Sequence, residues 1–239
     1  DMKKENWIEL DSGIHKTLKG KVVEKYAFNK GYIAHGDTIV RRNYIEKFDI
    51  VIFAVYPKVF IEWIKKYQDF FKPGTLITDV TGIKKWLVNE LNQILRPDVE
   101  FVGAHPMAGR EVGGVQNSNK EMFKEANFII TSTQKSTLMG MKTVEQIGEV
   151  LGFKNISTLT VDEHDEMIGF LSQLTHCIAI SLMTCKESSD LVEYTGDSFR
   201  DLTRIAKINE NMWSELFLLN KEELVSQITL FEKQLSKLK

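Results

Sequence analysis

The first two thirds of the chain alternate continuous apolar runs with stretches of helical periodicity. The run FDIVIFAV at residues 48–55 is apolar almost throughout, which is typical of a strand buried on both faces of a sheet. The stretch at 58–71 repeats apolar residues at helical spacing and stops at Lys72-Pro73-Gly74. The same alternation predicts strands at 75–80, 99–104, 127–132 and 156–161, and helices at 83–95 and 137–151. Strands that alternate with helices indicate a mostly parallel sheet covered by helices.

After residue 161 the pattern is helical only. Four helices are expected, at 162–186, 198–207, 209–219 and 221–238. Asn209 and Asn220 are the expected caps at two of the joins, and Asp197 or Ser198 at a third. The fold class is therefore α/β, with an α/β domain over residues 1–161 and an all-helical domain over residues 162–239.

The stretch from residue 167 to 185 contains no Asp, Glu, Lys or Arg and is long enough to span a bilayer. Polar residues are scattered through it, however, and lower its mean hydropathy. We expect a soluble helix buried in a core or against a partner subunit, and no membrane span.

Composition agrees with a soluble globular protein, since 43% of residues are hydrophobic and 27% are charged. The 31 basic and 33 acidic residues give a net charge of -2, which does not favour a nucleic-acid surface. Cys177 and Cys185 lie eight apart in one expected helix, a rise of about 12 Å, which is too long for a disulfide. Free thiols and the absence of a secretory signal in the first ten residues predict a cytoplasmic protein.

Three stretches follow expected strands, at 54–57, 79–84 and 104–109. Ligands bind beyond the carboxyl ends of the strands of a parallel sheet, so these stretches are expected to line one crevice. His105 then lies at its rim, in a loop. The residues alone leave two interpretations equally open, a ligand-site histidine or a loop histidine bonded to the backbone.

A second group of candidate residues lies in the helical part. Arg200, Asp201 and Arg204 are three and four residues apart, so they share one face of a helix. An arginine held by an aspartate is suited to binding a carboxylate at two points. A solvated ladder of salt bridges is the alternative, and it is the commoner outcome of such spacing.

Taken together, the motifs GAHPMAGRE, TDVTGIK, DEHDEM, SQLTH and FRDLTRIA…NMW resemble the prephenate dehydrogenase family in order and separation, from about residue 32 to the end. The resemblance implies a Rossmann-like nucleotide-binding domain followed by a helical domain that binds substrate and forms a homodimer. It also implies an NAD- or NADP-dependent oxidative decarboxylation of prephenate to 4-hydroxyphenylpyruvate, in tyrosine biosynthesis.

Carried over residue by residue, the resemblance assigns His105 as the catalytic base and Arg204 as the group that binds a substrate carboxylate. The implied substrate-binding residues are Arg204, Asp201, His176, Glu111, Gly82 and Trp213. The implied cofactor-binding residues are Val55, Tyr56, Pro57, Thr81 and Pro106. Gly82 stands where many relatives have a serine that contacts the ligand, so one hydrogen bond is expected either to be missing or to be supplied by Thr81.

The chain departs from the family at its start. No two glycines are separated by a single residue, so the G-x-G-x-x-G fingerprint is absent from the 239 residues. We expect the first two strands and their ribose-binding acid to be missing, and dinucleotide binding to be weakened or lost. An arogenate dehydrogenase, a non-catalytic relative that binds prephenate or aromatic keto acids, and a helical assembly module remain the alternatives.

Overall fold

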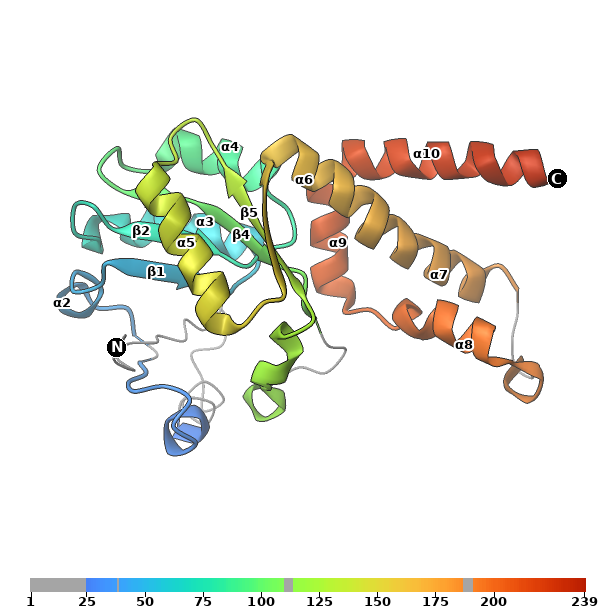
Figure 1. Cartoon of the computed structure of the whole chain (residues 1–239), viewed down its shortest axis with the longest axis horizontal. Helices are drawn as coiled ribbons and strands as arrows, with labels where there is room; N and C mark the ends of the chain where they lie inside the picture. The colour runs from blue at the N-terminus through green and yellow to red at the C-terminus, as the bar shows by residue number, and fades with distance from the viewer. Residues whose placement is uncertain (1–24, 38, 110–113, 187–190) are drawn as a thin grey trace. The chain divides into compact units, whose positions relative to one another are not determined.

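The structure, a computed structural model, describes residues 25–37, 39–109, 114–186 and 191–239 (Figure 1). The chain divides into two compact units, and each is described here by itself. The first unit comprises the residues up to Thr81 and Leu87–Leu159, and the second comprises Gly82–Trp86 and Thr160–Lys239. The division falls two residues before the predicted one and assigns the segment after the second strand to the helical unit.

The first unit contains two ladders of strands, and one continuous segment of chain leads from the first ladder into the second. β1 (Ile50–Phe53), β2 (Leu76–Asp79) and β3 (Glu100–Phe101) are parallel neighbours in that order. β4 (Gly103–Pro106) follows β3 after a single residue and pairs with β5 (Asn127–Ser132), which neighbours β6 (Asn155–Thr160). The β4–β5 pair is antiparallel, an addition to the expected parallel sheet.

The predicted burial of the 48–55 strand on both faces is wrong for most of β1. Only Phe53 is buried in β1, and the other three residues are half-buried. Among the described residues β1 has a single neighbour, β2, so it lies at an edge of the ladder where solvent reaches its side chains.

Helices lie on both sides of this sheet (Figure 1). α5 (Leu138–Leu151) passes in front of the strands, and α3 (Pro57–Tyr67) and α4 (Lys85–Ile94) lie behind them. A short helix, α2 (Arg42–Ile45), precedes β1. Single 3₁₀ turns occur at Gln68–Phe70, Val115–Asn117, Lys120–Phe123, Leu191–Tyr194 and Arg204–Ala206.

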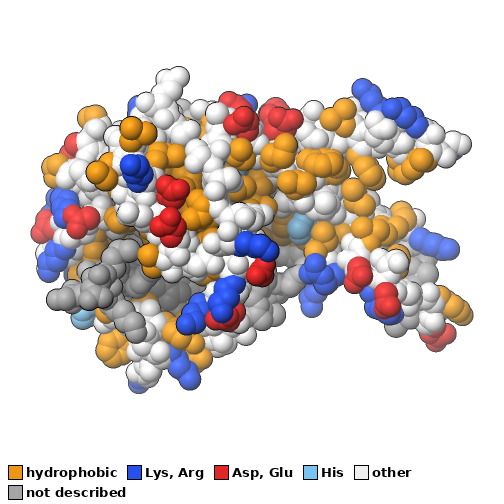
Figure 2. Space-filling model, in the orientation of Figure 1, with side chains coloured by type: hydrophobic (Ala, Val, Ile, Leu, Met, Phe, Trp, Pro, Cys, Tyr) orange, Lys and Arg blue, Asp and Glu red, His pale blue; other side chains and the backbone are white. Residues whose placement is uncertain are grey.

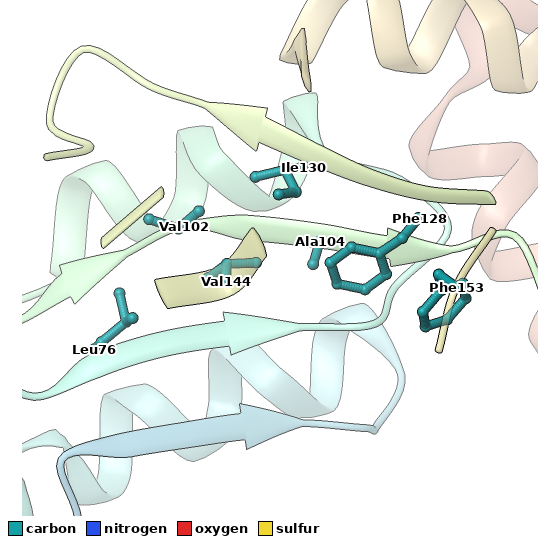
Figure 3. Packing of buried hydrophobic residues seen from close by; sticks show 7 residues of the cluster. All are labelled: Leu76, Val102, Ala104, Phe128, Ile130, Val144 and Phe153. Carbon is teal, nitrogen blue, oxygen red and sulfur yellow. The ribbon is translucent and has the colours of Figure 1, made fainter. Parts of the chain in front are cut away.

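Alternating strand side chains give the sheet two apolar layers. The layer against α5 contains the seven residues of Figure 3: Leu76, Val102, Ala104, Phe128, Ile130, Val144 and Phe153. A Cβ on Gly148 of α5 would lie 2.8 Å from Cδ1 of Phe128, so only glycine permits this close approach of helix and strand. On the opposite face, the Phe53 ring of β1 stacks on Phe60 of α3 with centroids 4.1 Å apart.

The second unit is helical. α6 (Val161–Ile168), a π-helical turn (Gly169–Leu174) and α7 (Thr175–Thr184) form one continuous helix where one was predicted. α8 (Asp197–Thr203), α9 (Glu210–Leu219) and α10 (Lys221–Leu238) follow. The π-helical turn was not predicted.

Of the expected caps, Asn209 is confirmed, Asn220 is the N-cap residue of α10 but without a side-chain cap bond, and Asp197 or Ser198 is wrong. The Asn209 side chain accepts a hydrogen bond from the N–H of Met212 and caps α9 as predicted. Asn220 makes no side-chain cap, because its amide donates instead to the Asp165 carbonyl and to Gln173 Oε1. Gly196, rather than Asp197 or Ser198, is the N-cap of α8, because the Asp197 carboxylate pairs with Arg200.

The helix Val161–Thr184 is long and apolar enough to cross a membrane by length and composition. Only 28% of its most apolar window is buried within the chain, since Met167, Phe170 and Leu171 are exposed. The described residues therefore cover only part of this helix. Burial against a partner subunit, the second of the two expected environments, stays a proposal.

Candidate functional site

The predicted site residues fall into two groups, one in each unit. In the first unit the carboxyl ends of β1 and β2 are neighbours, because Phe53 and Asp79 are paired and the N–H of Val80 donates to the Phe53 carbonyl at 3.1 Å. The first part of the predicted crevice edge is therefore assembled within one unit.

Asp79 is the residue that holds this edge together. Its carboxylate is fully buried and accepts hydrogen bonds from the N–H of Thr81 (2.9 Å), from the Thr81 hydroxyl and from the N–H of Ala104 (3.1 Å). A buried carboxylate requires such donors. Sequence reasoning did not select Asp79. An acidic residue at the end of an apolar run was the signal that could have identified it.

His105 lies inside β4, and the prediction of a loop position is wrong. The residue is paired with Ile129 of the antiparallel strand β5, which extends the ladder through Pro106. The preceding N–H, that of Ala104, is the one bonded to Asp79. The His105 side chain is half-buried, and its backbone is held by the pairing with β5 and by the bond of the preceding residue to Asp79. A group that must meet a ligand in one orientation needs such support.

The predicted cofactor residues lie around the same edge. Tyr56 is exposed and precedes the buried Pro57, which begins α3. Val55 lies between β1 and α3, and Thr81 is buried beside Asp79. The amino end of α3 thus follows closely after the carboxyl end of β1. At such a position the first backbone N–H groups of a helix can bind a ligand.

In the second unit the structure brings His176 and Trp213 together. Their ring centroids are 3.7 Å apart at 32°, and both side chains are half-buried. Nδ1 of His176 lies 2.8 Å from the Ser172 carbonyl, which can only accept, so Nδ1 carries the hydrogen. In the neutral ring Nε2 is therefore the hydrogen-bond acceptor.

Arg204 begins the 3₁₀ turn after α8, and this turn packs against α7, the helix that carries His176. Arg204 and Asp201 are both exposed. Arg200 does not take part in a ladder with them, because it binds Asp197 and the Thr195 carbonyl. The role of Asp201 in orienting Arg204 stays a prediction.

Of the remaining predicted residues, Gly82 is half-buried and Glu111 lies outside the described residues. Both cysteines are free thiols, as predicted. Burial raises the pKa of the Cys177 thiol, so this group stays protonated at neutral pH beside His176. The described residues contain no group of His, Cys, Asp and Glu suited to a metal ion.

A dinucleotide fits part of this arrangement. Pro57 at the start of α3 and Thr81 beside Asp79 lie at the carboxyl ends of two parallel strands, the edge of such a sheet at which dinucleotides bind. The pyrophosphate end requires a glycine-rich turn, and the 239 residues contain no G-x-G-x-x-G sequence.

The comparisons with known proteins agree on one family. The prephenate dehydrogenase nucleotide-binding domain matches residues 11–156, and the prephenate dehydrogenase dimerization domain matches residues 160–239. The chain is 30% identical to a prephenate dehydrogenase of Lactococcus lactis over 90% of its own length and 60% of the relative's. It is 30% identical to a Bacillus subtilis prephenate dehydrogenase, over 69% of its own length and 45% of the relative's.

Among solved structures, the chain is similar to prephenate dehydrogenase from A. aeolicus, in complex with hydroxyphenyl propionate and NAD+. The TM-score is 0.80 at 31% identity, over 95% of this chain and 81% of that one. The chain thus spans about half of the length of the two curated relatives, but both family domains are present in it. It belongs to the prephenate dehydrogenase family.

Proposed function

We propose that the chain carries the catalytic and substrate-binding residues of an NAD(P)-dependent prephenate dehydrogenase. The observation that supports this most is the fixed position of His105 in β4, one residue after the N–H that Asp79 binds. Family membership supports the same reaction, the oxidative decarboxylation of prephenate to 4-hydroxyphenylpyruvate in tyrosine biosynthesis.

In this proposal His105 is the general base. It accepts the proton of the hydroxyl on the substrate ring, so that the oxygen becomes a carbonyl as the hydride leaves the same carbon. The ring carboxylate then leaves as carbon dioxide, and the ring becomes the aromatic phenol. Ala108 and Gly109 follow His105 with little or no side chain, and among the described residues a Cβ on Gly109 would meet no atom within 4 Å.

Arg204 binds a carboxylate of the substrate in this proposal, and Asp201 and Glu111 are further substrate-binding residues in it. The His176–Trp213 ring pair is proposed to form one wall of the substrate site. Gly82 has no side chain, so only its backbone can contact the substrate. The preceding residue, Thr81, carries the nearest hydroxyl in the sequence.

The cofactor in the proposal is NAD or NADP. When bound, its nicotinamide ring supplies the acceptor for the hydride. Val55, Tyr56, Pro57, Thr81 and Pro106 are the residues proposed to hold that ring.

We further propose that the protein is a cytoplasmic homodimer that assembles through the helical unit. The name of the matching domain, a dimerization domain, supports this, as do the exposed apolar side chains of the helix Val161–Thr184. No nucleic acid or membrane is part of the proposal.

The test is formation of NADH or NADPH, followed by absorbance, from the purified chain with prephenate and each cofactor. We expect turnover, and for His105→Asn a loss of about 10²–10⁴-fold in kcat with substrate binding retained. Asn127→Asp is a matched control, because residue 127 is exposed at the start of β5, the strand that pairs with β4. Equal turnover by His105→Asn would contradict the assignment.

Two alternatives give different results in the same assay. Turnover with arogenate, and none with prephenate, favours an arogenate dehydrogenase. Binding of 4-hydroxyphenylpyruvate that is lost in Arg204→Ala, without turnover, favours a non-catalytic relative. Absence of both turnover and binding favours a helical assembly module.

A further inference from the structure

A buried acid in α6 has no part in the function proposed above. Asp165 is fully buried, and so is its neighbour His164. A buried carboxylate is costly unless several donors satisfy it. Three donors reach this one: the N–H of Lys84 and the N–H of Lys85, each at 2.8 Å, and Nδ1 of His164 at 2.6 Å.

The two backbone donors lie where α4 begins, at Lys85. The first N–H groups of a helix have no partner within it, and negative charge is favourable near them. Asp165 therefore caps the start of α4, although Asp165 itself belongs to α6. The Lys85 ammonium adds a second tie to α6, through the Asp162 carboxylate at 2.8 Å, which raises the pKa of Lys85.

Asp165 is itself held in place by its surroundings. The Asn220 amide donates to the Asp165 carbonyl at 3.0 Å and to Gln173 Oε1 at 2.9 Å. Gln173 lies in the π-helical turn and donates to the Leu216 carbonyl at 3.1 Å. This network joins three helices of the second unit around the acid, so its carboxylate has a fixed position.

Two residues separate Thr81 from Lys84, the positions that the two buried acids bind. Asp79 fixes Thr81, and Asp165 fixes Lys84, so Gly82 and Ile83 are held from both sides. Ile83 is fully buried and Gly82 is half-buried. We propose that Asp165 is a positioning residue, which fixes the backbone of Gly82 for contact with the substrate by binding the N–H groups of Lys84 and Lys85. The part of this inference that concerns substrate rests on the proposed function, and the anchor itself does not.

The anchor is tested by amide hydrogen exchange in Asp165→Asn, a variant of the same shape. We expect the Lys84 and Lys85 amides to exchange about tenfold to a hundredfold faster than in the wild type, because charge-assisted hydrogen bonds are lost. Asp162→Asn is the matched control, because it breaks the ion pair of Lys85 and leaves its N–H bonded. Unchanged exchange in Asp165→Asn, or an equal change in both variants, would overturn the anchor.

The positioning role is tested by steady-state kinetics. In Asp165→Asn the KM for prephenate is expected to rise by about tenfold, with a smaller change in kcat, because a binding contact moves and the base does not. Faster exchange with an unchanged KM would overturn the positioning role. If the wild type shows no turnover, the proposed function fails. Amide hydrogen exchange of Lys84 and Lys85 still tests the anchor in that case. The positioning role is then tested by comparing the dissociation constant of 4-hydroxyphenylpyruvate in the wild type and in Asp165→Asn.

A third measurement needs no variant and covers the case in which Asp165→Asn does not fold. In the wild type, the Lys84 and Lys85 amides should exchange at least about tenfold more slowly than those of Glu222 and Glu223. These two lie in the first turn of α10, which has no side-chain cap. Equal exchange in the two helix starts would contradict the anchor.

Discussion

At the scale of single residues, the Asp79 carboxylate has the most specific task in the first unit. It joins the end of β2 to β4 through Thr81 and Ala104. In Asp79→Asn an amide group would face these donors, and at least one charge-assisted hydrogen bond would be lost in a fully buried place. We expect the free energy of unfolding to fall by about 3 kcal/mol, measured by urea denaturation.

Thr81→Val is the comparison for this prediction. The substitution removes the hydroxyl that donates to Asp79, keeps the shape of the side chain and leaves both backbone donors in place. The expected loss is about 1 kcal/mol. If both variants lost the same free energy, the backbone donors would contribute nothing, and the account of Asp79 as the link between the strands would be wrong.

At the scale of elements, the start of α6 is a capping box. The Thr160 hydroxyl accepts from the N–H of Glu163, and the Glu163 carboxylate accepts from the N–H of Thr160 at 2.8 Å. Thr160→Ala should lower the free energy of unfolding by about 1 kcal/mol in urea denaturation. Ser157→Ala, at an exposed position of β6, is the control and is expected to change it by less than about 0.5 kcal/mol.

The same box predicts a dependence on pH. The N–H and hydroxyl of Thr160 lower the pKa of Glu163 from its ordinary 4.5. A lowered pKa in the folded state means that the charged box stabilises the protein above pH 4.5 and loses this contribution as the pH falls below it. Between pH 6 and pH 3, about the titration range of Glu, Glu163→Gln should therefore lose less stability than the wild type. An equal acid dependence in both proteins would contradict this account.

The order of strands and helices followed from the sequence because periods of two and of 3.6 residues are local features. Their partners are not local. His105 lies in a strand rather than a loop because β5, more than twenty residues later, extends the ladder past it. Likewise Asn220 matched a helix cap by residue type, but the buried Asp165 carbonyl and Gln173 compete for its amide. Sequence patterns select residue types, and tertiary partners decide their tasks.

At the scale of the whole molecule, the second unit exposes much apolar surface. Its exposed large apolar side chains on the helix Val161–Thr184 and on α10 are Met167, Phe170, Leu171, Met183, Val225, Leu230, Phe231, Leu235 and Leu238. Figure 2 shows hydrophobic side chains gathered over these helices on the face in view. Such surfaces are typical of interfaces between subunits. In the proposed homodimer the second subunit covers these side chains, which the described residues of a single chain leave exposed.

Leu171→Glu tests this assembly. The residue is 57% exposed and lies in the π-helical turn, so a charge there should be tolerated by the monomer and should be costly when a second subunit covers it. We expect the wild type to have twice the chain mass of 27.5 kDa in light scattering, and the variant to dissociate at concentrations about a hundredfold higher than the wild type. Leu138→Glu is the matched control, because Leu138 is 84% exposed but belongs to α5 in the first unit. A wild type of single mass, or dissociation of both variants alike, would show that the helical unit does not form the interface.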